Sequence, residues 1–234
     1  MPKIDAKEAK IILEGRNQLW DDTATVITDE AVDLFSQDPS YFFSDEDSAR
    51  ASGKECWVQG VAGYFHFKKL TELSDKMAEL LSKFQDRDDG EVYEITFGEK
   101  LTSLSETAAH WLGQTKGDLT FSAPLNLSDP SWASLAKLTG NLNLNHQDKL
   151  SDTTLEVLAQ HKGELGLGSL QNLSDAGAKS LAKHEGCLIL GSVEMSETAV
   201  LSLKNKLGTI KDWTIDGDEE MSPEDWAAYW LEDN

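Results

Sequence analysis

One stretch of sequence decides the fold of this chain: residues 163–182, which read GELGLGSLQNLSDAGAKSLA. Its first half is a Gly-x-Leu-x-Leu string, in which leucine recurs with the period of two that is typical of a short strand. Ser174 and Asp175 are typical of a helix start, because a serine oxygen accepts an orphan backbone N–H and a carboxylate faces the positive end of the helix dipole. Ala178, Leu181 and Ala182 then recur at helical spacing. The stretch predicts one strand followed by one helix of about three turns.

The same string recurs along the chain with a step of 23 residues, shortened to 22 at Met195-Ser196-Glu197. Four kinds of position keep this step through four units. They are Leu104, Leu127, Leu150 and Leu173, each followed by Ser and an acid; Leu112, Leu135, Leu158 and Leu181; Gly117, Gly140, Gly163 and Gly186; and the strand pairs Leu119 and Phe121, Leu142 and Leu144, Leu165 and Leu167, and Leu188 and Leu190. Such a register is far beyond what biased composition produces, so the chain is predicted to be an array of repeated units.

One unit cannot bury its apolar faces alone, so neighbouring units are expected to stack. The predicted fold class is α/β, a solenoid with parallel strands on the inner face and helices on the outer face. The repeated glycine is expected to adopt a left-handed conformation that ends each helix. An all-β parallel helix fits less well because the spacing after Ser-Asp is helical, and HEAT-type helical pairs fit less well because Gly-x-Leu-x-Leu is strand-like.

The string from Gly163 to Ala182 resembles the leucine-rich repeat family, and in particular its divergent, short, bacterial-type repeats of about 23 residues. The resemblance covers about residues 60 to 234. The chain departs from the family's loop position, where Leu170, Val193 or Pro124 replaces the usual Asn or Cys. The resemblance implies a solenoid and says little about function, because such scaffolds bind many unrelated partners.

Three regions are expected. Residues 1–60 are predicted to form an irregular N-terminal cap with one degenerate repeat that begins at Ile27-Thr28-Asp29, residues 61–220 the repeat array, and residues 221–234 a C-terminal capping helix. Bulky apolar residues in both end regions would shield the open ends of the core. These residues, which could instead form contact patches, are Tyr41, Phe42, Phe43 and Trp57 at one end and Trp226, Tyr229 and Trp230, expected along one helix face, at the other.

Composition limits the classes of partner. The formal net charge of −21 disfavours binding to nucleic acid or to anionic membranes, because those surfaces require clusters of Lys and Arg. No apolar run approaches the roughly 18 residues of a membrane span. The first ten residues place charges where a signal peptide needs apolar ones, and Cys56 and Cys187 form no disulfide framework or zinc-ligand spacing, so a cytoplasmic location is expected.

Residues that flank the buried strand leucines are expected to point onto the inner face, in rows about 4.8 Å apart from strand to strand. The partner-binding candidates on this basis are Tyr64, His66, Thr96, Asp118, Thr120, Asn141, Asn143, Asn145, Glu164, Asp212 and Thr214. The same rows contain Lys68, Glu94, Ser122, Cys187, Ile189 and Asp216, whereas Gly166, Gly168 and Gly191 leave part of the face bare.

Catalytic and metal motifs are not found in the sequence. The histidines do not form HExxH, and GxSxG, P-loop and GxGxxG patterns are missing. His161 and His184 hold equivalent repeat positions near helix C-termini, where a structural role is expected. The acidic strings at 86–90 and 216–220 fail the EF-hand pattern, so solvated loops are expected and no cofactor or metal is assigned.

The sequence thus predicts a non-enzymatic protein-interaction module with a protein partner that could be basic. It does not determine the oligomeric state, although a monomer is favoured. The alternatives are a structural scaffold that self-associates through its caps, and an acidic decoy that occupies a basic partner. An enzyme would need a titratable cluster in one cleft, which the sequence does not indicate.

Overall fold

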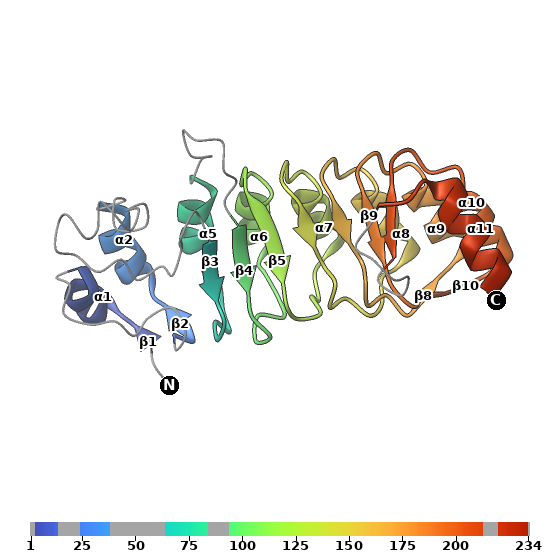
Figure 1. Cartoon of the computed structure of the whole chain (residues 1–234). Coiled ribbons are helices and arrows are strands. Elements are labelled where there is room, and N and C mark those ends of the chain that lie inside the picture. Colours follow the sequence, from blue (N-terminus) through green and yellow to red (C-terminus); the bar gives the residue numbers. More distant parts are fainter. Residues whose placement is uncertain (1–2, 14–23, 38–63, 84–93, 213–219, 234) are drawn as a thin grey trace, which may run out of the picture.

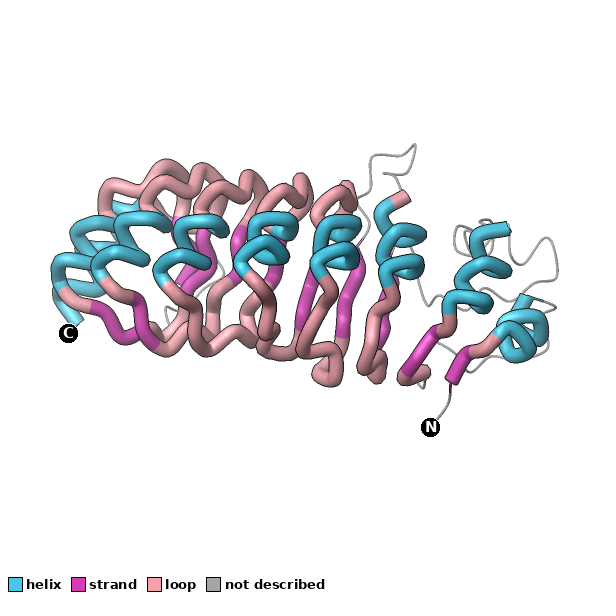
Figure 2. Tube along the Cα trace, turned by 180° about the vertical axis from the view of Figure 1, so that it is seen from behind, coloured by secondary structure: helices cyan, strands magenta, loops and turns pink. Residues whose placement is uncertain are grey.

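The chain is an elongated α/β protein with its two termini at opposite ends (Figure 1). The structure, a computed structural model, describes residues 3–13, 24–37, 64–83, 94–212 and 220–233. Strands and helices alternate along the chain, and Figure 2 shows the helices in a layer on one side of the strands. No helix among these residues combines the length and the apolar character that a membrane span requires.

The centre of the molecule is a parallel sheet of seven strands whose order follows the chain. The strands are β3 (Tyr64–Phe67), β4 (Glu94–Phe97), β5 (Asp118–Phe121), β6 (Leu142–Asn143), β7 (Leu165–Gly166), β9 (Leu188–Leu190) and β11 (Ile210–Asp212). Its register confirms the predicted parallel strands: Leu119, Leu142, Leu165 and Leu188, which are 23 residues apart, are paired in turn and are all fully buried.

Each strand is followed by a helix that packs against the helices of adjacent units. The helices are α5 (Asp75–Ser82), α6 (Glu106–Leu112), α7 (Asp129–Leu135), α8 (Asp152–Leu158), α9 (Asp175–Leu181) and α10 (Glu197–Leu203). Most have seven residues, about two turns, so the expected three turns were too long. A second pairing, between β8 (Asn172–Leu173) and β10 (Glu194–Met195), lies directly before the helix starts.

The Ser-acid pairs start the helices as predicted and also link neighbouring units. Ser174 Oγ accepts the N–H of Gly177 and donates its own proton to Asp152 Oδ1 of the preceding unit, at 2.5 Å. Ser128 bonds to Glu106 in the same way, at 3.0 Å. The motif therefore caps its own helix and ties it to the unit before it.

The repeated glycines do not end the helices in a left-handed conformation, as was predicted. The helices end before them, for example at Ala159, and among the described glycines only Gly208 has a positive φ, of 138°. A Cβ at Gly186 would lie 2.1 Å from the carbonyl oxygen of Gly163, and one at Gly163 would lie 2.3 Å from that of Gly140. Glycine is required here because successive backbones approach closely, not because a helix must stop.

The N-terminal region contains two helix-strand pairs where one degenerate repeat was predicted. They are β1 (Lys3–Ile4) with α1 (Ala6–Leu13), and β2 (Val26–Ile27) with α2 (Asp29–Gln37), and Ile4 pairs with Ile27 in parallel. The 23-residue step between these isoleucines matches the array, but the first copy carries Asp5 where a Ser or Thr would be expected. The aromatic residues predicted for a cap within 38–60 lie outside the described residues.

The C-terminal helix α11 (Pro223–Asp233) lies within the range predicted for a cap. Its aromatic residues do not share one environment: Trp226 is fully buried, Trp230 is partly buried and Tyr229 is 44% exposed. Met221, just before the helix, pairs antiparallel with Ile210 at the last edge of the large sheet. This contact covers part of an edge that would otherwise be open.

Candidate functional site

The strand face, defined as the face of the large sheet opposite the helices, carries two rows of residues that are aligned across the units by backbone register. The first row contains Tyr64, Glu94, Asp118, Asn141, Glu164, Cys187 and Thr209, and the second contains His66, Thr96, Thr120, Asn143, Gly166, Ile189 and Lys211. The predicted residues from Tyr64 to Glu164 therefore do fall in adjacent positions, except for Asn145. Asp212 does not join the rows either.

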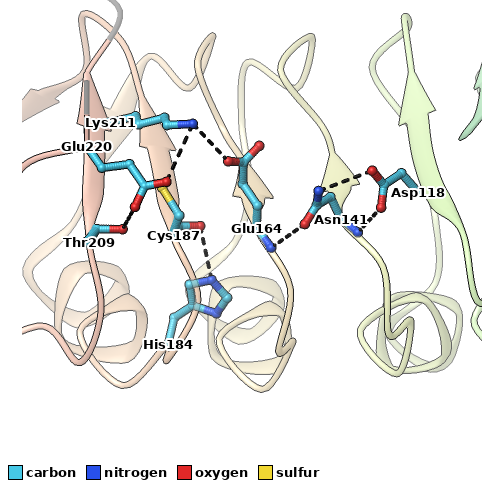
Figure 3. Close-up of polar contacts among 8 residues, drawn as sticks. All are labelled: Asp118, Asn141, Glu164, His184, Cys187, Thr209, Lys211 and Glu220. Atoms are coloured by element: carbon cyan, nitrogen blue, oxygen red, sulfur yellow. Dashed lines mark hydrogen bonds and ion pairs between the residues drawn. The ribbon is translucent and has the colours of Figure 1, made fainter. Parts of the chain in front are cut away.

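Side chains and backbone of successive units are hydrogen-bonded in the middle of the first row (Figure 3). Asp118 accepts the backbone N–H of Asn141 at 2.6 Å and its amide Nδ2 at 3.1 Å. Asn141 Oδ1 in turn accepts the backbone N–H of Glu164 at 2.9 Å. These bonds fix the orientation of the acidic and amide groups.

A second fixed carboxylate lies nearer the N-terminal end of the face. Glu94 Oε1 accepts the hydroxyl protons of Thr96, at 3.1 Å, and of Thr120, at 3.2 Å. All three side chains are partly exposed. Threonines of the second row therefore hold an acid of the first row in place.

Asn145 does not offer its side chain to a partner as predicted. It is 6% exposed, and its Oδ1 accepts the backbone N–H of Gly168 at 2.7 Å. A Cβ at Gly166 would lie 2.8 Å from the same oxygen, which explains why the second row is bare at that position. Asn145 is a structural link between units, whereas Asn143 remains partly exposed.

The predicted register of the last strand was wrong. Ile210 pairs with Leu188 and Asp212 with Leu190, so Asp212 takes a buried leucine position and is 6% exposed. The outward residues of β11 are Thr209 and Lys211, and Thr214 lies outside the described residues. Gly208 and Ile210 lie 22 residues after Gly186 and Leu188, the same shortened step that is seen at Met195. This spacing is the signal that would have given the correct register.

Charged groups converge at the C-terminal end of the strand face (Figure 3). Lys211 Nζ lies 3.4 Å from Glu164 Oε2 and 3.7 Å from Glu220 Oε1, and the Thr209 hydroxyl donates to Glu220 Oε2 at 2.7 Å. The pKa of Lys211 is raised, and the main cause is the negative charge of the Glu164 carboxylate. The Cys187 thiol lies beside the same carboxylates. Its pKa is raised, mainly because the thiol is partly buried.

Glu220 and Lys211 were missed as members of this site by sequence reasoning. Glu220 belongs to the acidic string 216–220, of which residues 216–219 lie outside the described residues, as does the string 86–90. It reaches the strand face because the next residue, Met221, pairs with Ile210. The sequence carries no signal for that pairing.

The interior contains a column of equivalent repeat positions near the helix C-termini, and most of its residues are polar. Its members are Thr115, Leu138, His161, His184 and Lys206, all buried. The rings of His161 and His184 are stacked with centroids 6.1 Å apart. The pKa of each histidine is lowered, mainly by burial, and the pKa of His184 falls to about 4. These features fit the structural role expected for the two histidines.

Lys206 is the last residue of that column, and it is only 6% exposed, which is unusual for a lysine. Its Nζ donates to the backbone carbonyl oxygens of His184 at 3.0 Å and Gly186 at 2.6 Å. Burial lowers its pKa to about 8. Lys206 therefore hydrogen-bonds carbonyl groups near the helix C-terminus of the preceding unit.

Chemically, the strand face offers fixed hydrogen-bond acceptors and an excess of negative charge. Its described acids include Glu94, Asp118, Glu164 and Glu220, whereas Lys211 is already paired with two of them. Such a surface attracts cationic groups. Comparison of the chain with protein-family models, curated proteins and solved structures gives no significant match.

Proposed function

We propose that this chain is a leucine-rich-repeat-like solenoid that works as a non-enzymatic protein-interaction module, with its strand face as the binding surface. The 23-residue repeat and the alternation of strand and helix support the family resemblance. The function is that of a scaffold on which side chains from many units act together.

The observation that carries the proposal is the hydrogen-bonded row from Asp118 through Asn141 to Glu164. A partner that binds such a surface loses less free energy to side-chain ordering, because these side chains are already held in place. Three consecutive units contribute to the row, so an extended segment lying across the strands would meet a new polar group about every 4.8 Å.

The partner is proposed to be a basic protein, and the chain to act in the cytoplasm. Glu94, Asp118 and Glu164 supply negative charge along the face, and the whole chain carries −21. Complementary charge speeds association and weakens with added salt. Binding through this face should therefore fall steeply between low and moderate salt.

The test compares partner capture from a native lysate by the wild-type chain and by two strand-face variants, Thr120→Arg and Asn143→Arg. Both introduce a long cation among the acids and should abolish capture of the proteins that the wild type retains. Matched controls are Thr198→Arg and Gln160→Arg, which place the same side chain at exposed positions in or just after a helix. Capture that persists in both strand-face variants would remove this face as the binding surface.

Self-association through the C-terminal end is the second candidate, favoured by the distribution of exposed apolar side chains. Among the described residues, the large hydrophobics that are clearly exposed are Leu201, Leu207, Tyr229 and Leu231. Light scattering coupled to size-exclusion chromatography separates the two functions. A mass that rises with concentration and returns to the monomer value in Leu201→Lys would favour self-association.

A further inference from the structure

Three metal-ligating side chains converge on the strand face from distant parts of the chain: Glu164, Cys187 and Glu220. One carboxylate oxygen of each glutamate and the Cys187 sulfur all lie within 4.8 Å of one another. Figure 3 shows the three side chains together with Lys211 and Thr209. Glu164 and Cys187 hold the same position in successive units, whereas Glu220 lies outside the repeat and is brought to them by the pairing of Met221 with Ile210.

We propose that Glu164, Cys187 and Glu220 form a binding site for a divalent transition-metal cation of the zinc class. One sulfur and two carboxylate oxygens match the ligands that zinc accepts, whereas magnesium and calcium prefer oxygen alone. Zinc holds its ligand atoms about 2.0–2.3 Å from the metal, so the donors must draw somewhat closer together. The two glutamate side chains are 30% and 48% exposed, which leaves them room to do so.

Lys211 marks the place where the cation would be held. Its ammonium lies 3.4 Å from Glu164 Oε2 and 3.7 Å from Glu220 Oε1, distances at the long end for ion pairs. It supplies one positive charge to a site with two carboxylates and a thiol. A divalent cation that binds the thiolate as well interacts more strongly with these groups, so it displaces the ammonium, whose flexible stem can turn toward solvent.

Thr209 and the thiol define two further properties of the site. The Thr209 hydroxyl donates to Glu220 Oε2 at 2.7 Å and so orients that carboxylate, as groups behind metal ligands commonly do. The Cys187 thiol must lose its proton to bind the metal, so binding releases a proton.

The test is a titration of the full chain, reduced and freed of metal by a chelator, with Co²⁺ and then Zn²⁺. Binding of Co²⁺ to a thiolate gives a ligand-to-metal absorption band in the near ultraviolet. We expect one equivalent to produce this band, and Zn²⁺ to abolish it by displacement. Excess Mg²⁺ should leave it unchanged, which separates the site from general attraction of cations to an acidic chain.

Two cysteine variants form a matched pair, since the chain has Cys56 and Cys187. Cys187→Ser should remove the band, and Cys56→Ser should retain it with unchanged affinity. A band that survives in Cys187→Ser, or no band in the wild type, overturns the proposal. Far-ultraviolet circular dichroism verifies that each variant is folded.

Two further variants test the site without altering the thiol. Glu220→Gln should weaken Co²⁺ binding by at least about tenfold, because it removes a charged ligand. Lys211→Met should tighten binding by about tenfold, because it removes the competing cation. Unchanged or weaker binding in Lys211→Met contradicts the placement of the ion. The site is independent of the proposed function, since metal binding is measured without any protein partner.

Discussion

The contact between Asp212 and Trp226 provides a sharp test of how the repeat array ends. Asp212 takes the position that leucine holds in the preceding units, and it is 6% exposed. Trp226, in α11, is fully buried and donates its indole N–H to Asp212 Oδ2 at 2.9 Å. The pair therefore joins the last strand to the capping helix by a buried, charge-assisted hydrogen bond.

Trp226→Phe removes the donor and keeps most of the apolar ring. A hydrogen bond to a charged group contributes about 1.5–3 kcal/mol, and the smaller ring loses roughly 1 kcal/mol of burial, so the free energy of unfolding should fall by about 3 kcal/mol. Asp212→Leu restores the residue of the other units but leaves the indole N–H without this acceptor, which should cost about 1–3 kcal/mol. In the double variant both partners of this hydrogen bond are replaced, so neither is left without the other.

The assay is urea unfolding of the wild type, both single variants and the double variant, followed by circular dichroism and by tryptophan fluorescence. The double variant should be about 2 kcal/mol more stable than the sum of the single effects predicts. The slopes of the unfolding curves should stay equal, so that the four free energies can be compared. Additivity to within about 0.5 kcal/mol would show that the two groups do not depend on each other and would refute this account.

Three further predictions concern the array itself. Burial lowers the pKa of His184 from 6.5 to about 4, so the unfolded chain takes up a proton first as the pH falls. The stability that neutral His184 provides is fully present above about pH 6.5 and is lost toward pH 4, by roughly 3 kcal/mol. His184→Leu, which copies Leu138, should therefore reduce the loss of stability between pH 7 and pH 4 in urea unfolding; an identical pH dependence in the variant would be contrary to this expectation. Ser174→Ala should lower the free energy of unfolding by about 1 kcal/mol, because Gly177 N–H loses its capping acceptor, whereas Ser180→Ala in the same helix should have little effect. Gly186→Ala should lower it by about 2 kcal/mol and reduce the melting temperature, because the new Cβ would press on the Gly163 carbonyl oxygen; a variant as stable as the wild type would show that the backbones can separate easily.

The sequence predicted the buried side of the strands better than the exposed side. Leucines at Leu119, Leu142 and Leu165 follow the repeat because each must contact its equivalent in the next unit, so their partners can be inferred from spacing alone. Residues on the other side of the strands have no such requirement, so spacing does not show whether they are exposed. Asn145 was expected to be exposed, but its side chain is buried and accepts a hydrogen bond from the backbone of the next unit.

The end of the array was the least predictable part. A step of 22 residues shifts Ile210 and Asp212 by one position from the register inferred for 23, and a shift of one residue exchanges the two faces of a strand. An aspartate in place of a leucine gave no hint of burial, because its partner Trp226 lies in a helix outside the repeat.

By itself, the sequence determined that the chain alternates strand and helix, where each helix starts, and which leucines align. These features depend on neighbouring residues and on a period, both of which can be read along one dimension. Only the tertiary structure decided that Asp212 is buried against Trp226 and that Glu164, Cys187 and Glu220 meet at one point. The physical reason is that Trp226 and Glu220 lie outside the repeat, so these contacts exist only once the chain before α11 has paired with the edge of the sheet.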